Sequence, residues 1–184
     1  MRHRSATVLL ACLALAGCAN TTGRFNYVHT EGYTASTAAF AAADGPTSVV
    51  VRNNPFPGDA DGARFVAAMP TDTIWRFKFV NSRPARSYGY LFVIEFGQNA
   101  KLGTYSVCTI DLPVQTPLPP DSASDGIPFR AGFCRNGSGI SEVAGVAPNA
   151  PSPDAPEFRN FLANLVSSLT PPNDSPSIRD YEGG

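Results

Sequence analysis

The chain has 184 residues, of which 43% are hydrophobic and 16% charged, a balance that suits a folded protein with one sizeable core rather than a disordered chain. Its 14 basic and 15 acidic residues give a formal net charge of −1. This charge lacks the basic excess of proteins that bind nucleic acids, so we expect no nucleic-acid partner.

The N-terminus has the layout of a secretory signal. Arg2 and Arg4 precede an apolar run over residues 6–19, which is shorter than the ~20 residues that a membrane-spanning helix needs. A basic start, a short apolar core and small residues at its end are the three parts of a signal peptide. We therefore expect a leader peptide over residues 1–17. An ordinary secretory signal is the alternative to a leader of a more specific class.

The leader ends in Leu15-Ala16-Gly17-Cys18, which resembles the lipobox of bacterial lipoprotein precursors. The resemblance implies cleavage before Cys18 and lipidation of its thiol, so that the protein is held at a membrane by two or three acyl chains. Each buried methylene contributes about 0.8 kcal/mol, which makes such attachment effectively permanent. By resemblance to enterobacterial lipoproteins, Ala19 in place of an aspartate implies the outer membrane, with the protein facing the periplasm.

The remainder divides into three expected parts. Residues 18–30 are small and polar with scattered aromatics, which predicts a flexible tether. Residues 31–170 form a single α+β domain, and residues 171–184 form a disordered tail. Loss of the leader with its two arginines changes the formal charge from −1 to −3.

Two cysteines are left for the domain. Cys12 leaves with the leader and Cys18 takes the lipid, so Cys108 and Cys134 remain as thiols in an oxidising compartment, and we expect a disulfide. Its loop of roughly 27 residues predicts a stabilisation of ~3.5 kcal/mol. A metal pair or a redox-active thiol is the alternative, but there is no C-x-x-C motif and His29 is the only histidine after the leader. We expect no metal and no cofactor.

The sequence of the first half of the domain predicts a helix, a strand and a second helix. Residues 34–45, "TASTAAFAAADG", offer Thr34 or Ser36 as an N-cap before an alanine-rich helix. Residues 47–52, "TSVVVR", are a β-branched strand, and residues 59–69, "DADGARFVAAM", have apolar residues at helical spacing. The acids of "DADG" suit a helix N-terminus better than a calcium loop, which needs a closing glutamate.

Four segments then read as strands. In residues 73–80, "TIWRFKFV", aromatic residues alternate with cations, which predicts the clearest strand. Residues 88–97, "YGYLFVIEFG", are apolar on both faces apart from Glu95, as in a central strand. The other two are residues 103–110 and 127–135, and the Asn136-Gly137 pair predicts a hairpin into a further strand at 141–146.

The end of the domain holds a loop and a helix. Residues 113–128 are rich in proline, which predicts a disordered flap or a contact surface. In "DAPEFRNFLANLVSSLTPP", residues 154–172, Asp154 and Glu157 are spaced as a capping box before an apolar helical stripe. The whole order predicts an antiparallel sheet of five to six strands with two to three helices packed on one face, with a β-sandwich as the alternative.

The sequence contains no catalytic signature. A hydrolytic triad needs an imidazole near its nucleophile, and His29 lies in the expected tether. Glu95 is an acid in an unusual place, and a strand-end ion pair with Arg76, Lys78 or Arg130 explains it better than glycosidase chemistry, which needs two carboxylates across a cleft. We therefore expect that the protein is not an enzyme.

One basic cluster remains as a candidate interaction patch: Arg76, Lys78, Arg83 and Arg86, near Tyr88. Anionic lipid headgroups, lipopolysaccharide phosphates, peptidoglycan carboxylates or an acidic protein surface would suit it. The alternative is a solvated strand face followed by a charged loop.

Taken whole, the chain resembles small lipoproteins of proteobacteria, on the lipobox and the segments "VVVRNNPF", "GFCR" and "PEFRNFLANLVSSL". This resemblance carries no activity. The expected function is a lipid-anchored protein of the cell envelope that acts as a non-enzymatic interaction or assembly module, with an envelope protein or an anionic envelope component as partner. The alternative is a lipid-anchored binder of a small or amphipathic ligand, in a cavity between sheet and helices.

Overall fold

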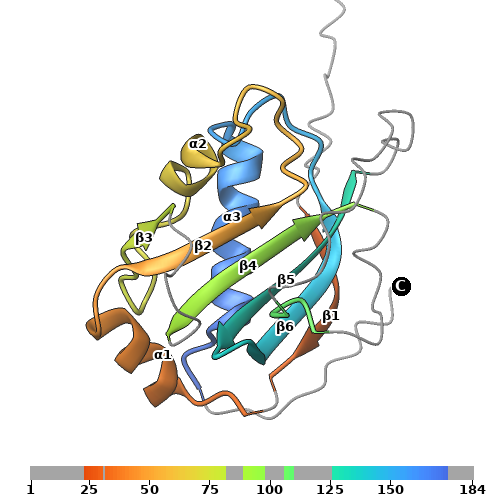
Figure 1. The fold of residues 1–184 in the computed structure, drawn as a ribbon. Helices are drawn as coiled ribbons and strands as arrows, with labels where there is room; N and C mark the ends of the chain where they lie inside the picture. The colour runs from red at the N-terminus through yellow and green to blue at the C-terminus, as the bar shows by residue number, and fades with distance from the viewer. Residues whose placement is uncertain (1–22, 31, 82–88, 98–105, 110–125, 174–184) are drawn as a thin grey trace, which may run out of the picture.

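A computed structural model describes residues 23–30, 32–81, 89–97, 106–109 and 126–173. These residues form an α+β fold, as the sequence predicts: one open six-stranded sheet in the order β1-β6-β5-β4-β2-β3, with helix α3 lying across one face (Figure 1). The strands are β1 (Arg24–His29), β2 (Thr47–Arg52), β3 (Phe79–Val80), β4 (Tyr90–Phe96), β5 (Ile127–Arg135) and β6 (Ser138–Ala147). The helices are α1 (Ala35–Ala43), α2 (Ala63–Ala67) and α3 (Pro156–Leu169).

The sheet is mixed rather than antiparallel throughout. The pairs β4–β5, β5–β6 and β6–β1 are antiparallel, as predicted, but β2 runs parallel to both of its neighbours, β4 and β3. Parallel neighbours need a crossover connection instead of a tight turn. The segment between β2 and β3, which includes α2, provides this crossover. It carries the chain from the C-terminal end of β2 back to the end of the sheet where β2 begins.

Strand β1 corrects the prediction of a tether over residues 18–30. Residues 24–29 of that range pair with β6 at the edge of the sheet. Phe25 anchors the strand, since its ring lies 5.8 Å from that of Phe129 on β5 and 6.0 Å from that of Phe161 on α3. Phe25, which looked like an isolated aromatic residue in a polar segment, is therefore part of the core packing. The expected leader, Cys18 and the residues up to 22 lie outside the described residues.

The predicted strand over residues 73–80 is wrong except at its last two residues, which form β3. Arg76 has a φ of 54°, a left-handed conformation that interrupts an extended strand. The aromatic residues still face inward: Phe77 is buried, and the indole nitrogen of Trp75 donates to the carbonyl of Thr170 at 2.8 Å, just past the end of α3. The alternation of aromatic and charged residues in this segment therefore arises because an irregular segment packs its aromatic side chains into the core.

The other described elements agree with the sequence in type. Thr34 caps α1 by accepting a hydrogen bond from the backbone N–H of Thr37 at 3.2 Å. Asn136 and Gly137 have φ values of 53° and 77°, the pair of left-handed residues that a type I′ hairpin turn requires. The capping box is wrong, because Ala155 is the N-cap of α3 and Asp154 instead binds Arg64 at 2.6 Å.

The main core lies between α3 and the sheet. Helix α3 turns the predicted stripe toward the strands, and these residues are fully or almost fully buried: Phe158, Phe161, Leu162, Leu165, Val166 and Leu169. Phe158 also packs edge-on against Phe56 and Phe65, at 4.8 and 5.6 Å between ring centroids, which joins α2 and its preceding loop to the same core. Burial of this aromatic layer holds the helices on one face, as predicted.

We predict that Phe25→Ala lowers the free energy of unfolding by about 2 kcal/mol, because it removes a ring packed on two others. The measurement is urea unfolding of the purified protein. Asn26→Ala is the matched control, since Asn26 is the exposed neighbour on the same strand. Equal, small effects of the two substitutions would mean that β1 behaves as a tether after all.

Candidate functional site

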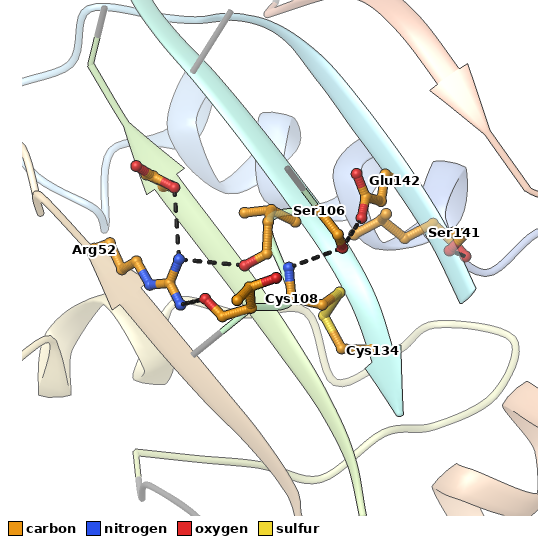
Figure 2. The surroundings of a disulfide bond; sticks show 10 residues. Arg52, Ser106, Cys108, Cys134, Ser141 and Glu142 are labelled. Carbon is orange, nitrogen blue, oxygen red and sulfur yellow. Dashed lines mark hydrogen bonds and ion pairs between the residues drawn. A yellow bond between two sulfur atoms is a disulfide. The ribbon is translucent and has the colours of Figure 1, made fainter. Parts of the chain in front are cut away.

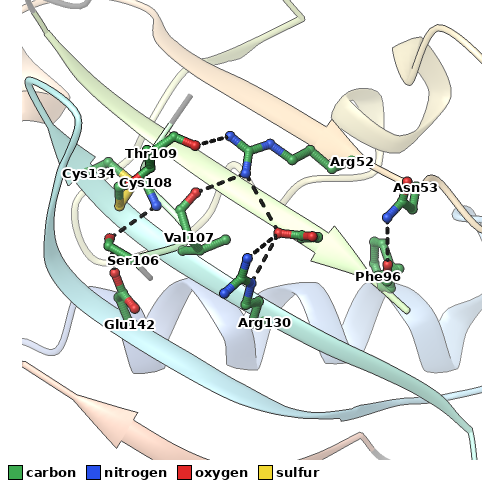
Figure 3. A network of polar contacts seen from close by, with 11 residues as sticks. Arg52, Asn53, Phe96, Ser106, Val107, Cys108, Thr109, Arg130, Cys134 and Glu142 are labelled. Atoms are coloured by element: carbon green, nitrogen blue, oxygen red, sulfur yellow. Dashed lines mark hydrogen bonds and ion pairs between the residues drawn. A yellow bond between two sulfur atoms is a disulfide. The ribbon is translucent and has the colours of Figure 1, made fainter. Parts of the chain in front are cut away.

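The most distinctive site lies on the sheet face opposite α3. There the side chains of Arg52, Glu95 and Arg130 form a row across β2, β4 and β5, because the three residues are in register on adjacent strands. Arg130 donates to the carboxylate of Glu95 from Nε at 3.1 Å and from a terminal nitrogen at 2.9 Å, and Arg52 lies 3.6 Å from the same oxygen (Figure 3). Their side chains are only 6–12% exposed.

A short segment, residues 106–109, covers this face beside the row. Arg52 donates to the carbonyl of Val107 at 3.2 Å and to that of Thr109 at 2.8 Å, while its guanidinium also reaches Glu95 (Figure 3). One arginine thus ties the covering segment to the buried carboxylate. These four residues form a turn instead of the predicted strand, and the rest of that expected strand lies outside the described residues.

The disulfide between Cys108 and Cys134 is confirmed. Its Cα atoms are 5.6 Å apart, and it fixes the covering segment to β5 (Figure 2). Both cysteines are fully buried in a second, small apolar cluster with Leu91, Val93 and Val107. The bond therefore lies on a sheet face.

Gly132 makes room for this arrangement. A Cβ atom at Gly132 would lie 2.6 Å from a methyl group of Val107 and 3.0 Å from the sulfur of Cys108. Such distances are well inside van der Waals contact, so only glycine lets the covering segment approach β5 this closely.

Ser106 and Glu142 extend the polar contacts toward β6. The Ser106 hydroxyl donates to the carboxylate of Glu142, and it accepts a hydrogen bond from the backbone N–H of Cys108 at 3.2 Å (Figure 2). The covering segment is therefore held at three points: by Arg52, by the disulfide and by Glu142. Each of these groups is engaged in holding the fold together.

The sequence identified part of this site. Glu95, Arg130 and the two cysteines were singled out, and Arg130 is the confirmed partner of Glu95. Arg76 and Lys78 do not pair with Glu95, because they are exposed in the segment before β4. Arg52 was missed. Its only signal was its place at the end of a β-branched strand, and its parallel register with β4 decides its contact.

The predicted interaction patch is only partly described. Arg76 and Lys78 are exposed, while Arg83, Arg86 and Tyr88 lie outside the described residues, as does the proline-rich loop up to residue 125. The exposed Ile74, at 67% exposure, precedes the two cations on the same segment. The described part of the patch therefore combines basic and apolar side chains.

A separate hollow of about 590 Å³ opens between the end of α2 and the N-terminal half of α3. Its volume is within the range of small-molecule sites. It has a mixed lining of apolar and polar residues: Ala67, Ala68, Met69, Pro70, Thr71, Asp72, Asp154, Pro156, Arg159, Asn160 and Ala163.

Comparisons with protein-family models, with curated proteins and with solved structures find no match for this chain. Among the described residues, no three or more His, Cys, Asp or Glu side chains gather where they could hold a metal ion. No helix in the described ranges combines the length and the apolar character that crossing a membrane requires. We therefore infer the chemistry of the site from its geometry.

We predict that Glu95→Gln lowers the free energy of unfolding by about 3 kcal/mol, because two buried guanidinium groups lose the carboxylate that they share. Asp154→Asn is the matched control: its ion pair with Arg64 is more than half exposed, so its loss should cost less than about 1 kcal/mol. Chemical denaturation of both variants measures the difference. A smaller loss in Glu95→Gln than in Asp154→Asn would contradict a structural role for the row.

Proposed function

We propose that this chain is a lipid-anchored protein of the bacterial cell envelope, attached to the outer membrane through Cys18 and exposed to the periplasm. The folded part acts as a non-enzymatic interaction or assembly module. The lipobox supports the attachment, and the buried disulfide suits an oxidising compartment.

The observation that carries the non-enzymatic role is the commitment of reactive side chains to the fold. Glu95 lies between two arginines, and both cysteines are joined in a buried bond. Asp59, the other buried acid among the described residues, accepts hydrogen bonds from the backbone N–H groups of Arg64 and Phe65, both at 2.8 Å, and so starts α2. These groups stabilise the fold, whereas exposed cations and apolar side chains remain for recognition.

A binder of a small ligand is the second candidate. The hollow between α2 and α3 favours this function, because its volume is within the range of small-molecule sites. Its lining includes Asp72, Asp154 and Arg159, which suits a polar ligand better than an amphipathic one. The interaction module remains the preferred function.

We predict that Cys18→Ala abolishes lipid attachment. The expected result is an uncleaved or soluble protein that takes up no labelled fatty acid, because the acceptor thiol is gone. Membrane fractionation and mass measurement of the purified product check it. Cys12→Ala is the matched control, and it should leave processing unchanged. Normal processing and membrane retention of Cys18→Ala would contradict the proposed anchor.

We further predict that the anchored protein forms a complex with a second envelope protein. Native electrophoresis of envelope membranes dissolved in a mild detergent should resolve a species larger than the monomer, with one second polypeptide in constant ratio. A protein that migrates only as a monomer would contradict the interaction module.

A further inference from the structure

The end of the sheet where β2 and β4 begin has an exposed apolar and basic surface. At this end the strand register pairs Thr47 on β2 with Phe79 on β3, and Tyr90 on β4 with Arg135 on β5. Helix α1 leads directly into β2 and lies at the same end (Figure 1). We name this surface the distal end and define it by Phe40, Lys78, Tyr90 and Arg135.

Apolar and cationic groups of the distal end are in direct contact. Phe40, on α1, is 59% exposed, and its ring lies 6.1 Å from that of Tyr90. The guanidinium of Arg135 lies over the same tyrosine ring at 5.3 Å, a cation–π contact. Helix α1 has no charged residue between its ends. An exposed phenylalanine beside a half-buried tyrosine thus forms a continuous apolar patch.

The rim of the distal end is mainly basic. The backbone N–H of Thr47 donates to the carbonyl of Lys78 at 2.8 Å, which brings exposed Lys78 next to Thr47, and exposed Arg76 lies two residues earlier. Asp44, the C-cap of α1, is an acidic residue at this end. A basic rim in a chain of net negative charge points to an acidic partner.

The chain enters the fold at the opposite end of the sheet. Arg24, the first residue of β1, pairs with Val146, which also pairs with Pro128 on β5. The eight residues of β5 from Pro128 to Arg135 are seven steps apart, which span about 24 Å at about 3.4 Å per step. The distal end therefore lies about 24 Å from the start of β1.

The link to the proposed lipid is too short to turn the domain over. Five peptide units separate Cys18 from Gly23, and even a fully extended chain covers at most about 18 Å over that length. If the distal end faced the bilayer, the start of β1 would stand about 24 Å from it, beyond the reach of the link. An anchored domain therefore cannot rest its distal end on its own membrane, and we expect this end to face away from it.

We propose that the distal end is a docking surface for an acidic envelope protein that receives Phe40 in an apolar pocket. This inference rests on the proposed function, because it uses the anchor at Cys18. Aromatic residues and arginine are enriched where protein partners bind most tightly, and the basic rim suits carboxylates around such a pocket. The anchoring bilayer is excluded by the length of the link, and a glycan adduct is one of the outcomes that would overturn the proposal.

The test is site-specific photocrosslinking in cells that make the full lipidated protein. A photoreactive phenylalanine analogue replaces Phe40 or, as the control at the other end of the fold, the exposed Asn160 on α3. We expect one protein adduct from position 40 and none from position 160. Lys78→Glu should lower the yield from position 40 at least tenfold, while Lys78→Arg, which keeps the charge, should retain it.

The outcomes separate the two proposals. A phospholipid or glycan adduct at position 40, or a protein adduct at position 160 alone, would overturn the docking surface, as would a yield that Lys78→Glu leaves unchanged. If the native complex is present in these cases, the interaction module itself stands. Loss of the complex altogether would contradict the proposed function instead.

Discussion

Strand β4 must be covered on both of its faces, and the rest of the structure is arranged around this requirement. Residues 91–96 are at most 5% exposed. Aromatic side chains between the sheet and α3 cover one face. On the other face the strand carries Leu91, Val93 and Glu95, and a bare sheet face of that composition would be unstable in water.

The described part of the second cover is small, and it is fastened at several points. Four described residues, 106–109, have little surface of their own to bury, so packing alone would hold them weakly. Three kinds of contact supply the missing stability: the disulfide, the two hydrogen bonds from the Arg52 side chain to backbone carbonyls, and the contact of Ser106 with Glu142. A buried carboxylate beneath them is tolerated because Arg52 and Arg130 surround it.

Much of the fold could be predicted from local pattern. Runs of β-branched residues, the Asn136-Gly137 turn and the apolar stripe of α3 act within a few residues, so the sequence identifies them. The disulfide followed from counting cysteines in an oxidising compartment. The strand predicted for residues 73–80 is wrong except at its last two residues. Their alternating aromatic side chains pack into the core from an irregular segment, in which Arg76 departs from the extended conformation.

Features set by long-range pairing could not be predicted in the same way. Arg52 joins Glu95 only because β2 is parallel to β4, and nothing within "TSVVVR" specifies that direction. The residues of β1 follow a small, polar stretch of sequence, and their place in the sheet depends on contacts with β6 and α3, far along the chain. The same pairing shortens the link to Cys18, on which the proposed orientation of the domain depends.

Energy transfer from the protein to the membrane tests the proposed orientation. Trp75 is the only tryptophan of the chain, and it lies near the C-terminal end of α3, toward the distal end. The lipidated protein would be placed in vesicles with dansyl-labelled headgroups, beside the variant Arg24→Trp, Trp75→Phe, whose fluorophore lies at the start of β1. The account predicts clearly weaker transfer from Trp75 than from position 24. Equal or stronger transfer from Trp75 would contradict it, because the distal end would then rest on the bilayer.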